Sequence, residues 1–68
     1  MTNEEKQKII LNLEKPYYSI YEAAEILGVH ERTIRYQINH GNLVAGKAGR
    51  QWRIAKDDLL AFVAPRNV

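Results

Sequence analysis

Side chains that can bond to nucleic acid are concentrated in one segment of the chain, between His30 and His40. The sequence predicts a helix over residues 31–40, in which Ile34 and Ile38 form an apolar stripe that faces the core. The rest of this helix carries side chains of the types that contact base edges and phosphates, and the candidate DNA-binding residues here are His30, Glu31, Arg32, Thr33, Arg35, Tyr36 and Asn39. This composition favours a DNA-reading surface over an ordinary solvated helix face.

A second group of polar side chains surrounds Gly46 and Gly49, two residues that allow a tight turn close to another surface. We expect residues 46–50 to join a strand over residues 43–45 to a strand over residues 51–54. Arginine is attracted by the negative potential of a narrow minor groove, and the candidate DNA-binding residues of this hairpin are Lys47, Arg50, Gln51 and Arg53. The alternative is a hairpin that only faces solvent.

Trp52 lies on the opposite face of the second expected strand, together with Ile54. A single indole beside an apolar strand residue is more typical of a core than of a surface on which bases stack. We therefore predict a structural role for Trp52, between the hairpin and the helices.

Basic side chains are unevenly distributed along the sequence. The formal net charge is only +2, from ten basic and eight acidic residues. Residues 29–54 contain five basic side chains and one acidic side chain, whereas the remainder contains five basic and seven acidic ones. This asymmetry is typical of a protein with one surface that faces a polyanion, although chance surface charge gives the same count.

The segment before the candidate DNA-reading helix predicts a second helix with a defined start and stop. Ser19 and Glu22 have the spacing of a capping box, and Gly28 is suited to a left-handed terminus. A helix-turn-helix also needs a small residue where its helices cross, a turn glycine and a branched apolar residue that holds the second helix, and Ala24, Gly28 and Ile34 meet these requirements. The structural candidates are therefore Ser19, Glu22, Ala24, Gly28, Ile34, Ile38 and Trp52.

Three further elements complete the expected order. A helix over residues 3–15 carries Ile9, Ile10 and Leu13 on one face and is ended by Pro16. That face packs on its own domain or contacts a partner, and the sequence leaves both alternatives open. A short strand over residues 17–18 and a last helix over residues 56–63, with Asp57 and Asp58 in its first turn and Pro65 after it, are also expected. The predicted organisation is a helical extension (1–16), a DNA-binding domain (17–64) and a short tail (65–68).

The composition argues against several classes of protein. A chain of 68 residues without cysteine has neither a disulfide framework nor a thiolate metal site. His30 and His40 are ten residues apart, about 15 Å along one helix, so they cannot share a metal. No catalytic or nucleotide-binding motif is present, and no apolar run is long enough to span a membrane. We expect a cytoplasmic protein that is not an enzyme and needs no cofactor or metal.

The sequence resembles the excisionase-type winged helix-turn-helix domain, a minimal relative of the MerR-type DNA-binding domain. The similar segments are YSIYEAAEILGV (18–29), RTI (32–34), GNL (41–43) and GRQWRI (49–54), while TIRY (33–36) is similar to the recognition helix of MerR-type regulators. The resemblance implies a mainly α fold with a small β-hairpin wing, a recognition helix in the major groove and a wing on the flanking backbone or minor groove. Two residues depart from the pattern: His30 replaces the usual serine cap, and Gln37 occupies a position that is usually apolar.

The resemblance also implies a biological role, that of an excisionase, or recombination directionality factor, of a bacterial or phage mobile element. Such a protein binds double-stranded DNA at the nucleoid, bends it and directs a tyrosine or serine integrase, with cooperative self-association on DNA. A small phage or plasmid transcription regulator is the alternative with the same domain. An adaptor that binds proteins through residues 3–15 is the alternative from another class.

Overall fold

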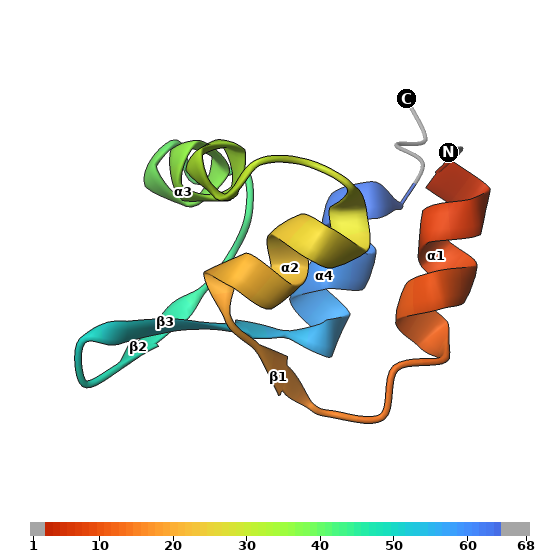
Figure 1. Cartoon of the computed structure of the whole chain (residues 1–68), viewed down its shortest axis with the longest axis horizontal. Coiled ribbons are helices and arrows are strands. Elements are labelled where there is room, and N and C mark those ends of the chain that lie inside the picture. Colours follow the sequence, from red (N-terminus) through yellow and green to blue (C-terminus); the bar gives the residue numbers. More distant parts are fainter. Residues whose placement is uncertain (1–2, 65–68) are drawn as a thin grey trace.

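Within residues 3–64, four helices and three short strands follow one another in the order predicted from the sequence. The computed structural model describes residues 3–64, which form α1 (Asn3–Leu11), β1 (Tyr17–Tyr18), α2 (Ile20–Leu27), α3 (Glu31–Asn39), β2 (Gly46–Ala48), β3 (Gln51–Ala55) and α4 (Lys56–Val63). Helix α3 and the β2–β3 hairpin lie at one side of the molecule, and α1 lies at the other (Figure 1). The fold is mainly helical with a small antiparallel sheet, which confirms a winged helix-turn-helix.

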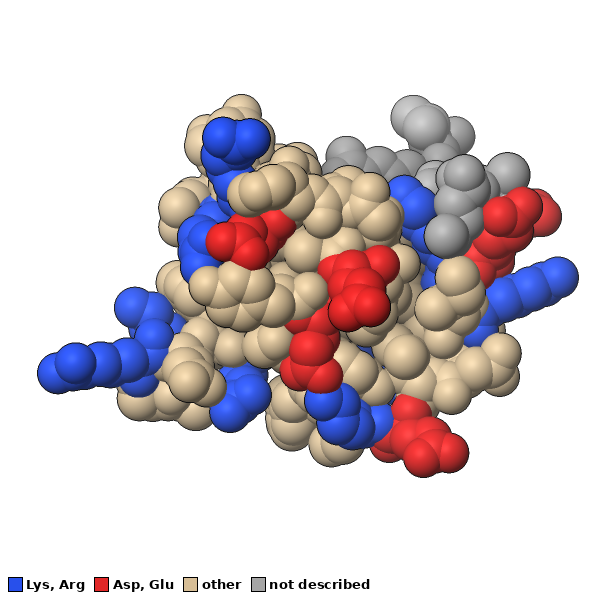
Figure 2. Space-filling view, viewed as in Figure 1, with Lys and Arg blue, Asp and Glu red and all other residues tan. Residues whose placement is uncertain are grey.

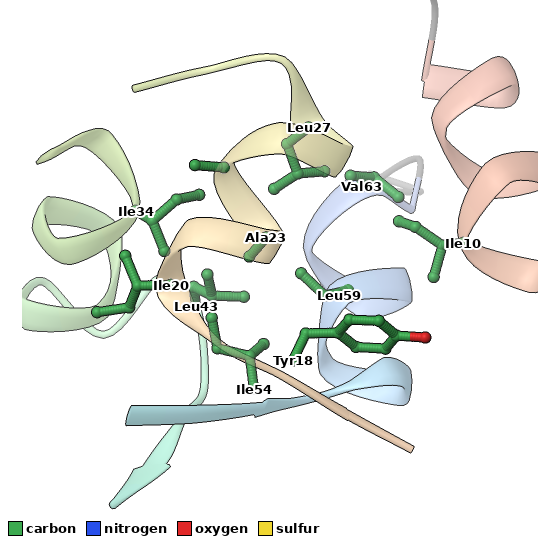
Figure 3. Packing of buried hydrophobic residues seen from close by; sticks show 11 residues of the cluster. Ile10, Tyr18, Ile20, Ala23, Leu27, Ile34, Leu43, Ile54, Leu59 and Val63 are labelled. Carbon is green, nitrogen blue, oxygen red and sulfur yellow. The ribbon is translucent and has the colours of Figure 1, made fainter. Parts of the chain in front are cut away.

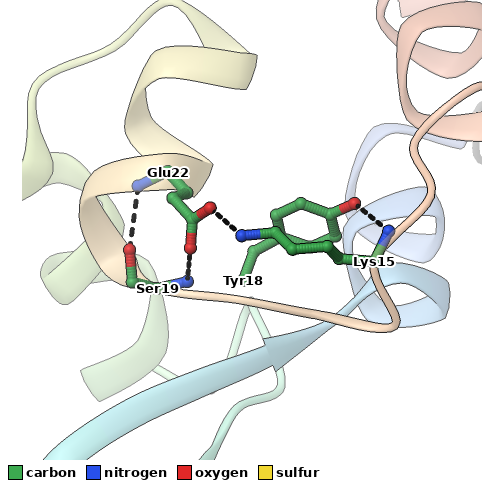
Figure 4. Close-up of polar contacts among 4 residues, drawn as sticks. All are labelled: Lys15, Tyr18, Ser19 and Glu22. Carbon is green, nitrogen blue, oxygen red and sulfur yellow. Dashed lines mark hydrogen bonds and ion pairs between the residues drawn. The ribbon is translucent and has the colours of Figure 1, made fainter.

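Local signals set the boundaries of the helix-turn-helix as predicted. The Ser19 side chain accepts a hydrogen bond from the Glu22 backbone N–H at 3.1 Å, and the Glu22 carboxylate accepts one from the Ser19 N–H at 3.0 Å (Figure 4). At the other end of α2, Gly28 adopts the left-handed conformation, with φ of 70°. Helix α3 ends at Asn39, with His40 as its C-terminal cap, one residue before the predicted end.

Departures from the family pattern are accommodated by hydrogen bonds. The imidazole of His30 caps α3, because its Nδ1 accepts a hydrogen bond from the Arg32 backbone N–H at 3.0 Å. Gln37 is half-buried, and its side-chain oxygen accepts a hydrogen bond from the Asn42 amide at 2.9 Å. The polar side chain of Gln37 therefore orders the turn after α3.

The sheet has the order β1-β3-β2, and both pairs are antiparallel. The predicted strand over residues 43–45 is wrong, because the first hairpin strand is Gly46–Ala48. The backbone N–H of Leu43 donates to the Gln37 carbonyl at 3.2 Å, and the Leu43 side chain is buried in the core, so this segment packs against α3. Only residues 49–50 form the turn, rather than residues 46–50. Of these two residues, Gly49 has a positive φ and Arg50 does not, which is the pattern of a type II′ hairpin turn.

The core lies between α2, α4 and the sheet. Ile54 in the central strand and Leu59 in α4 are completely buried, and Ile34 attaches α3 to the same cluster (Figure 3). Trp52 packs against this cluster but is only half-buried, and Ile38 is likewise partly buried. The buried residues are Ile10, Tyr18, Ile20, Ala23, Ala24, Leu27, Ile34, Leu43, Ile54, Leu59 and Val63.

Helix α1 is shorter than predicted and packs on the domain. It ends at Leu11 rather than at Lys15, and its residue Ile10 is completely buried beside α4. The ammonium group of Lys56 donates to the carbonyls of Leu11 and Leu13 at 3.1 and 2.9 Å, so it satisfies carbonyl groups at the end of α1. Ile9 remains exposed, and Pro65, predicted to close α4, lies outside the described residues.

Candidate nucleic-acid interface

The outward face of α3 carries the side chains that the sequence suggested for DNA recognition. Arg32, Thr33, Arg35, Tyr36 and Asn39 are exposed, and Glu31 is half-buried. The buried stripe on the opposite side positions this face, because Ile34 is fixed in the core with only 1% of its surface exposed.

Histidines lie at both ends of α3, and their Nδ1 atoms have opposite hydrogen-bonding roles. His30 Nδ1 accepts a hydrogen bond at the start of the helix, which leaves its Nε2–H exposed as a donor. At the other end, His40 Nδ1 lies 2.9 Å from the Tyr36 carbonyl, so this nitrogen carries the proton. The ring of His40 also stacks on the ring of Tyr36, with 3.9 Å between centroids, and the stacking restricts the orientation of this exposed tyrosine.

Arg35 is held by contacts to two different helices. Its guanidinium donates to the Tyr21 hydroxyl at 3.4 Å and to the Glu31 carboxylate at 3.5 Å, and it lies over the Tyr21 ring, 5.6 Å from the centroid. The hydrogen bond to Tyr21, followed by that to Glu31, raises the pKa of Arg35 above its ordinary value. This arginine is therefore charged and directed toward the start of α2.

The wing, defined as the β2–β3 hairpin of residues 46–55, exposes the remaining candidates. Lys47 and Trp52 are cross-strand partners, and the Lys47 ammonium lies over the indole, 5.1 Å from the ring centroid. Arg53 donates to the Gln51 side-chain oxygen at 3.3 Å, which aligns these two side chains on the same strand face. Arg50 is exposed in the turn. The wing thus presents three cations on a short scaffold.

A hollow of about 410 Å³ lies between α3 and the wing. Its lining combines Arg35 of α3 and Arg50 of the wing turn with Ser19, Ile20, Tyr21, Gln51 and Trp52. The two groups of candidates, which are separate in the sequence, therefore meet at one surface feature.

Basic side chains predominate over acidic ones at the side of the molecule formed by α3 and the wing, whereas basic and acidic side chains are interspersed over the rest of this view (Figure 2). In the described part of the chain, no three His, Cys, Asp or Glu side chains are grouped so that they could hold a metal ion. No helix within residues 3–64 has the length and hydropathy needed to cross a membrane.

Sequence reasoning missed Tyr21 as a member of this surface. Its side chain is 60% exposed, lines the hollow and bonds to Arg35, which is fourteen residues away in the chain. One signal was available in the sequence: the helical period places Tyr21 away from the apolar face of α2, which Ile20, Ala23 and Leu27 form. Its contact with Arg35 depends on the crossing of α2 and α3.

Comparison with known families agrees with this geometry. Residues 17–67 match the family model of a helix-turn-helix domain, and the chain therefore belongs to the helix-turn-helix domain family. Membership indicates sequence-specific DNA binding, and domains of this kind are typically not enzymes. No curated protein and no solved structure shows a significant match to the chain.

Proposed function

We propose that the chain binds double-stranded DNA with α3 in the major groove and the wing on the adjacent backbone or minor groove. The observation that carries this proposal is the convergence of α3 and the wing, because both line one hollow and both expose cations on the same side of the molecule. An α-helix fits the major groove, and arginine is favoured in a narrow minor groove. Base-edge contacts are assigned to Arg32, Thr33, Tyr36 and Asn39. At the start of α3, His30 caps the helix and Glu31 pairs with Arg35.

We further propose that this binding serves excision of a mobile element, so that the chain acts as an excisionase beside a tyrosine or serine integrase. The similarity of residues 17–63 to excisionase-type domains supports this role. The small interface also supports it, because one recognition helix and one wing offer few contacts and favour action next to a larger protein or a second copy. A transcription regulator of a phage or plasmid is the second candidate, since fold alone does not separate the two roles.

The test first selects the DNA site that the chain binds most tightly from a library of random duplexes; this is the selected site. Binding is then compared between duplexes that carry one or two copies of the selected site, at several salt concentrations. If the basic side chains of residues 29–54 neutralise about four phosphates, the logarithm of the affinity falls with the logarithm of salt at a slope of about −3.6 per protomer. We expect tighter binding per site on the two-site duplex, because neighbouring copies add contacts. The selected sites should lie beside an integrase gene.

A matched control is available on α1. Lys8→Ala removes one exposed charge far from the proposed interface and should leave affinity and slope unchanged, whereas Arg32→Ala should weaken binding to the selected site. Equal affinity per site on both duplexes, with tight binding to one site at physiological salt, would contradict the cooperative excisionase and favour a self-sufficient regulator. Sites that lie over promoters would favour the same alternative.

A further inference from the structure

We propose that the hollow between α3 and the wing binds a phosphodiester group of the DNA backbone, and that Arg35 contacts this phosphate, positioned by Tyr21, instead of reading a base. The inference rests on the proposed function, because it takes α3 to lie in the major groove and the wing at the adjacent minor groove. It assigns to Arg35 a different task from that of Arg32 on the same helix.

The geometry of B-form DNA supplies the first argument. The major and minor grooves are separated by a sugar–phosphate strand, so a protein that reaches into both grooves must let this strand pass between its two contacting elements. The hollow of about 410 Å³ lies between such elements, since α3 contributes Arg35 to its lining and the wing contributes Arg50 and Trp52. Its position is therefore the position that the strand must occupy.

The chemistry of the lining suits a sugar–phosphate strand. Arg35 and Arg50 provide two cations, and none of the residues that line the hollow is acidic. Ser19 and Gln51 add polar groups, whereas the exposed Tyr21 provides apolar ring surface for the sugars. Guanidinium groups bind phosphate oxygens with parallel hydrogen bonds, which makes arginine well suited to this task.

The orientation of Arg35 is the observation that separates the two roles. A base-reading arginine must extend from α3 into the groove, but the Arg35 guanidinium lies over the Tyr21 ring and bonds to the Tyr21 hydroxyl on α2. Both hydrogen bonds of the guanidinium are long, 3.4 and 3.5 Å, and an arginine side chain has five N–H donors. Donors therefore remain for a phosphate while Tyr21 keeps the group in place.

The carboxylate of Glu31 weakens the binding of a phosphate in the hollow. Its carboxylate lies 3.5 Å from the Arg35 guanidinium, so it competes with a phosphate for the same cation. Glu31→Gln removes this competition, and we expect it to tighten binding to selected and random duplexes by the same factor. Glu31 thus limits the affinity that Arg35 contributes.

The experiment measures the affinity of the full chain for the selected duplex and for a random duplex, at several salt concentrations. Arg35→Ala should weaken binding to both duplexes equally, by about fivefold at 0.15 M salt, and reduce the magnitude of the salt slope by about 0.9, because one phosphate contact is lost. Tyr21→Phe keeps the ring and removes the hydroxyl. We expect it to weaken both complexes equally, by about twofold, with the slope unchanged because no charge is lost.

Arg32→Ala is the comparison within α3, and we expect it to weaken the selected complex more than the random one. Tyr21 and Arg35 are both exposed, and a thermal melt of each variant verifies that the fold is intact. The inference is overturned if Arg35→Ala lowers affinity for the selected duplex at least tenfold more than for the random one, or if it changes neither. Wild-type chain that shows no salt-dependent binding to either duplex would instead refute the proposed function.

Discussion

Replacing Trp52 with alanine tests whether the indole supports the wing or contacts DNA. Trp52 packs against the hydrophobic core from the central strand, and its ring also carries the Lys47 ammonium at 5.1 Å from the centroid. Truncating a fully buried tryptophan costs about 3–5 kcal/mol. Because Trp52 is only half-buried, we expect a smaller loss of about 2–3 kcal/mol.

This loss is large for a domain of 68 residues, whose total stability is about 3–10 kcal/mol. In a domain of this size each kcal/mol shifts the melting temperature by about 4–8 °C, so Trp52→Ala should lower it by about 10–20 °C. Thermal melts followed by far-UV circular dichroism measure the shift without relying on the indole as a fluorophore. Trp52→Phe is the matched control, since it retains an aromatic ring against the core, and its melting temperature should fall by less than half as much.

DNA binding then decides between the two roles of Trp52. If the indole is structural, the Trp52→Ala variant should bind DNA with wild-type affinity at a temperature low enough for it to be fully folded. A variant that melts within about 3 °C of wild type but no longer binds DNA would refute the reasoning and place Trp52 in the interface.

Two further predictions concern contacts that hold the helices in place. The Lys15 ammonium, followed by the Ser19 backbone N–H, lowers the pKa of Glu22 in the folded state. The ionised carboxylate therefore contributes its full share of the free energy of unfolding above the unfolded pKa of about 4.3. This contribution is lost as pH falls through the lowered, folded-state pKa. Glu22→Gln should therefore be less stable than wild type at pH 7 and approach it at pH 3 in urea titrations, and a gap that stays constant across this range would contradict the assignment. Lys56→Met removes both hydrogen bonds to the end of α1 and should cost about 1 kcal/mol, with faster hydrogen exchange in α1. Unchanged exchange there would show that Ile10 alone holds the helix.

Much of the helix-turn-helix is determined by the sequence itself, because its signals act within a few residues. Ser19 and Glu22 define the start of α2, Gly28 ends it, and the spacing of Ile34 and Ile38 selects the inward side of α3. Once the inward side of α3 is known, the exposed candidates follow by exclusion. The polar types of those residues then suggest DNA recognition before any tertiary contact is considered.

Tertiary structure decided the features that depend on residues far apart in the chain. Strand β2 begins at Gly46 because Leu43 is drawn into the core beside α3, and no apolar alternation marks a strand whose three residues are all exposed. The end of α1 is capped by Lys56, forty-five residues beyond Leu11. The contact of Tyr21 with Arg35 and the hollow shared with Arg50 arise only where α2, α3 and the wing meet, because side chains without a common local period are brought together by packing alone.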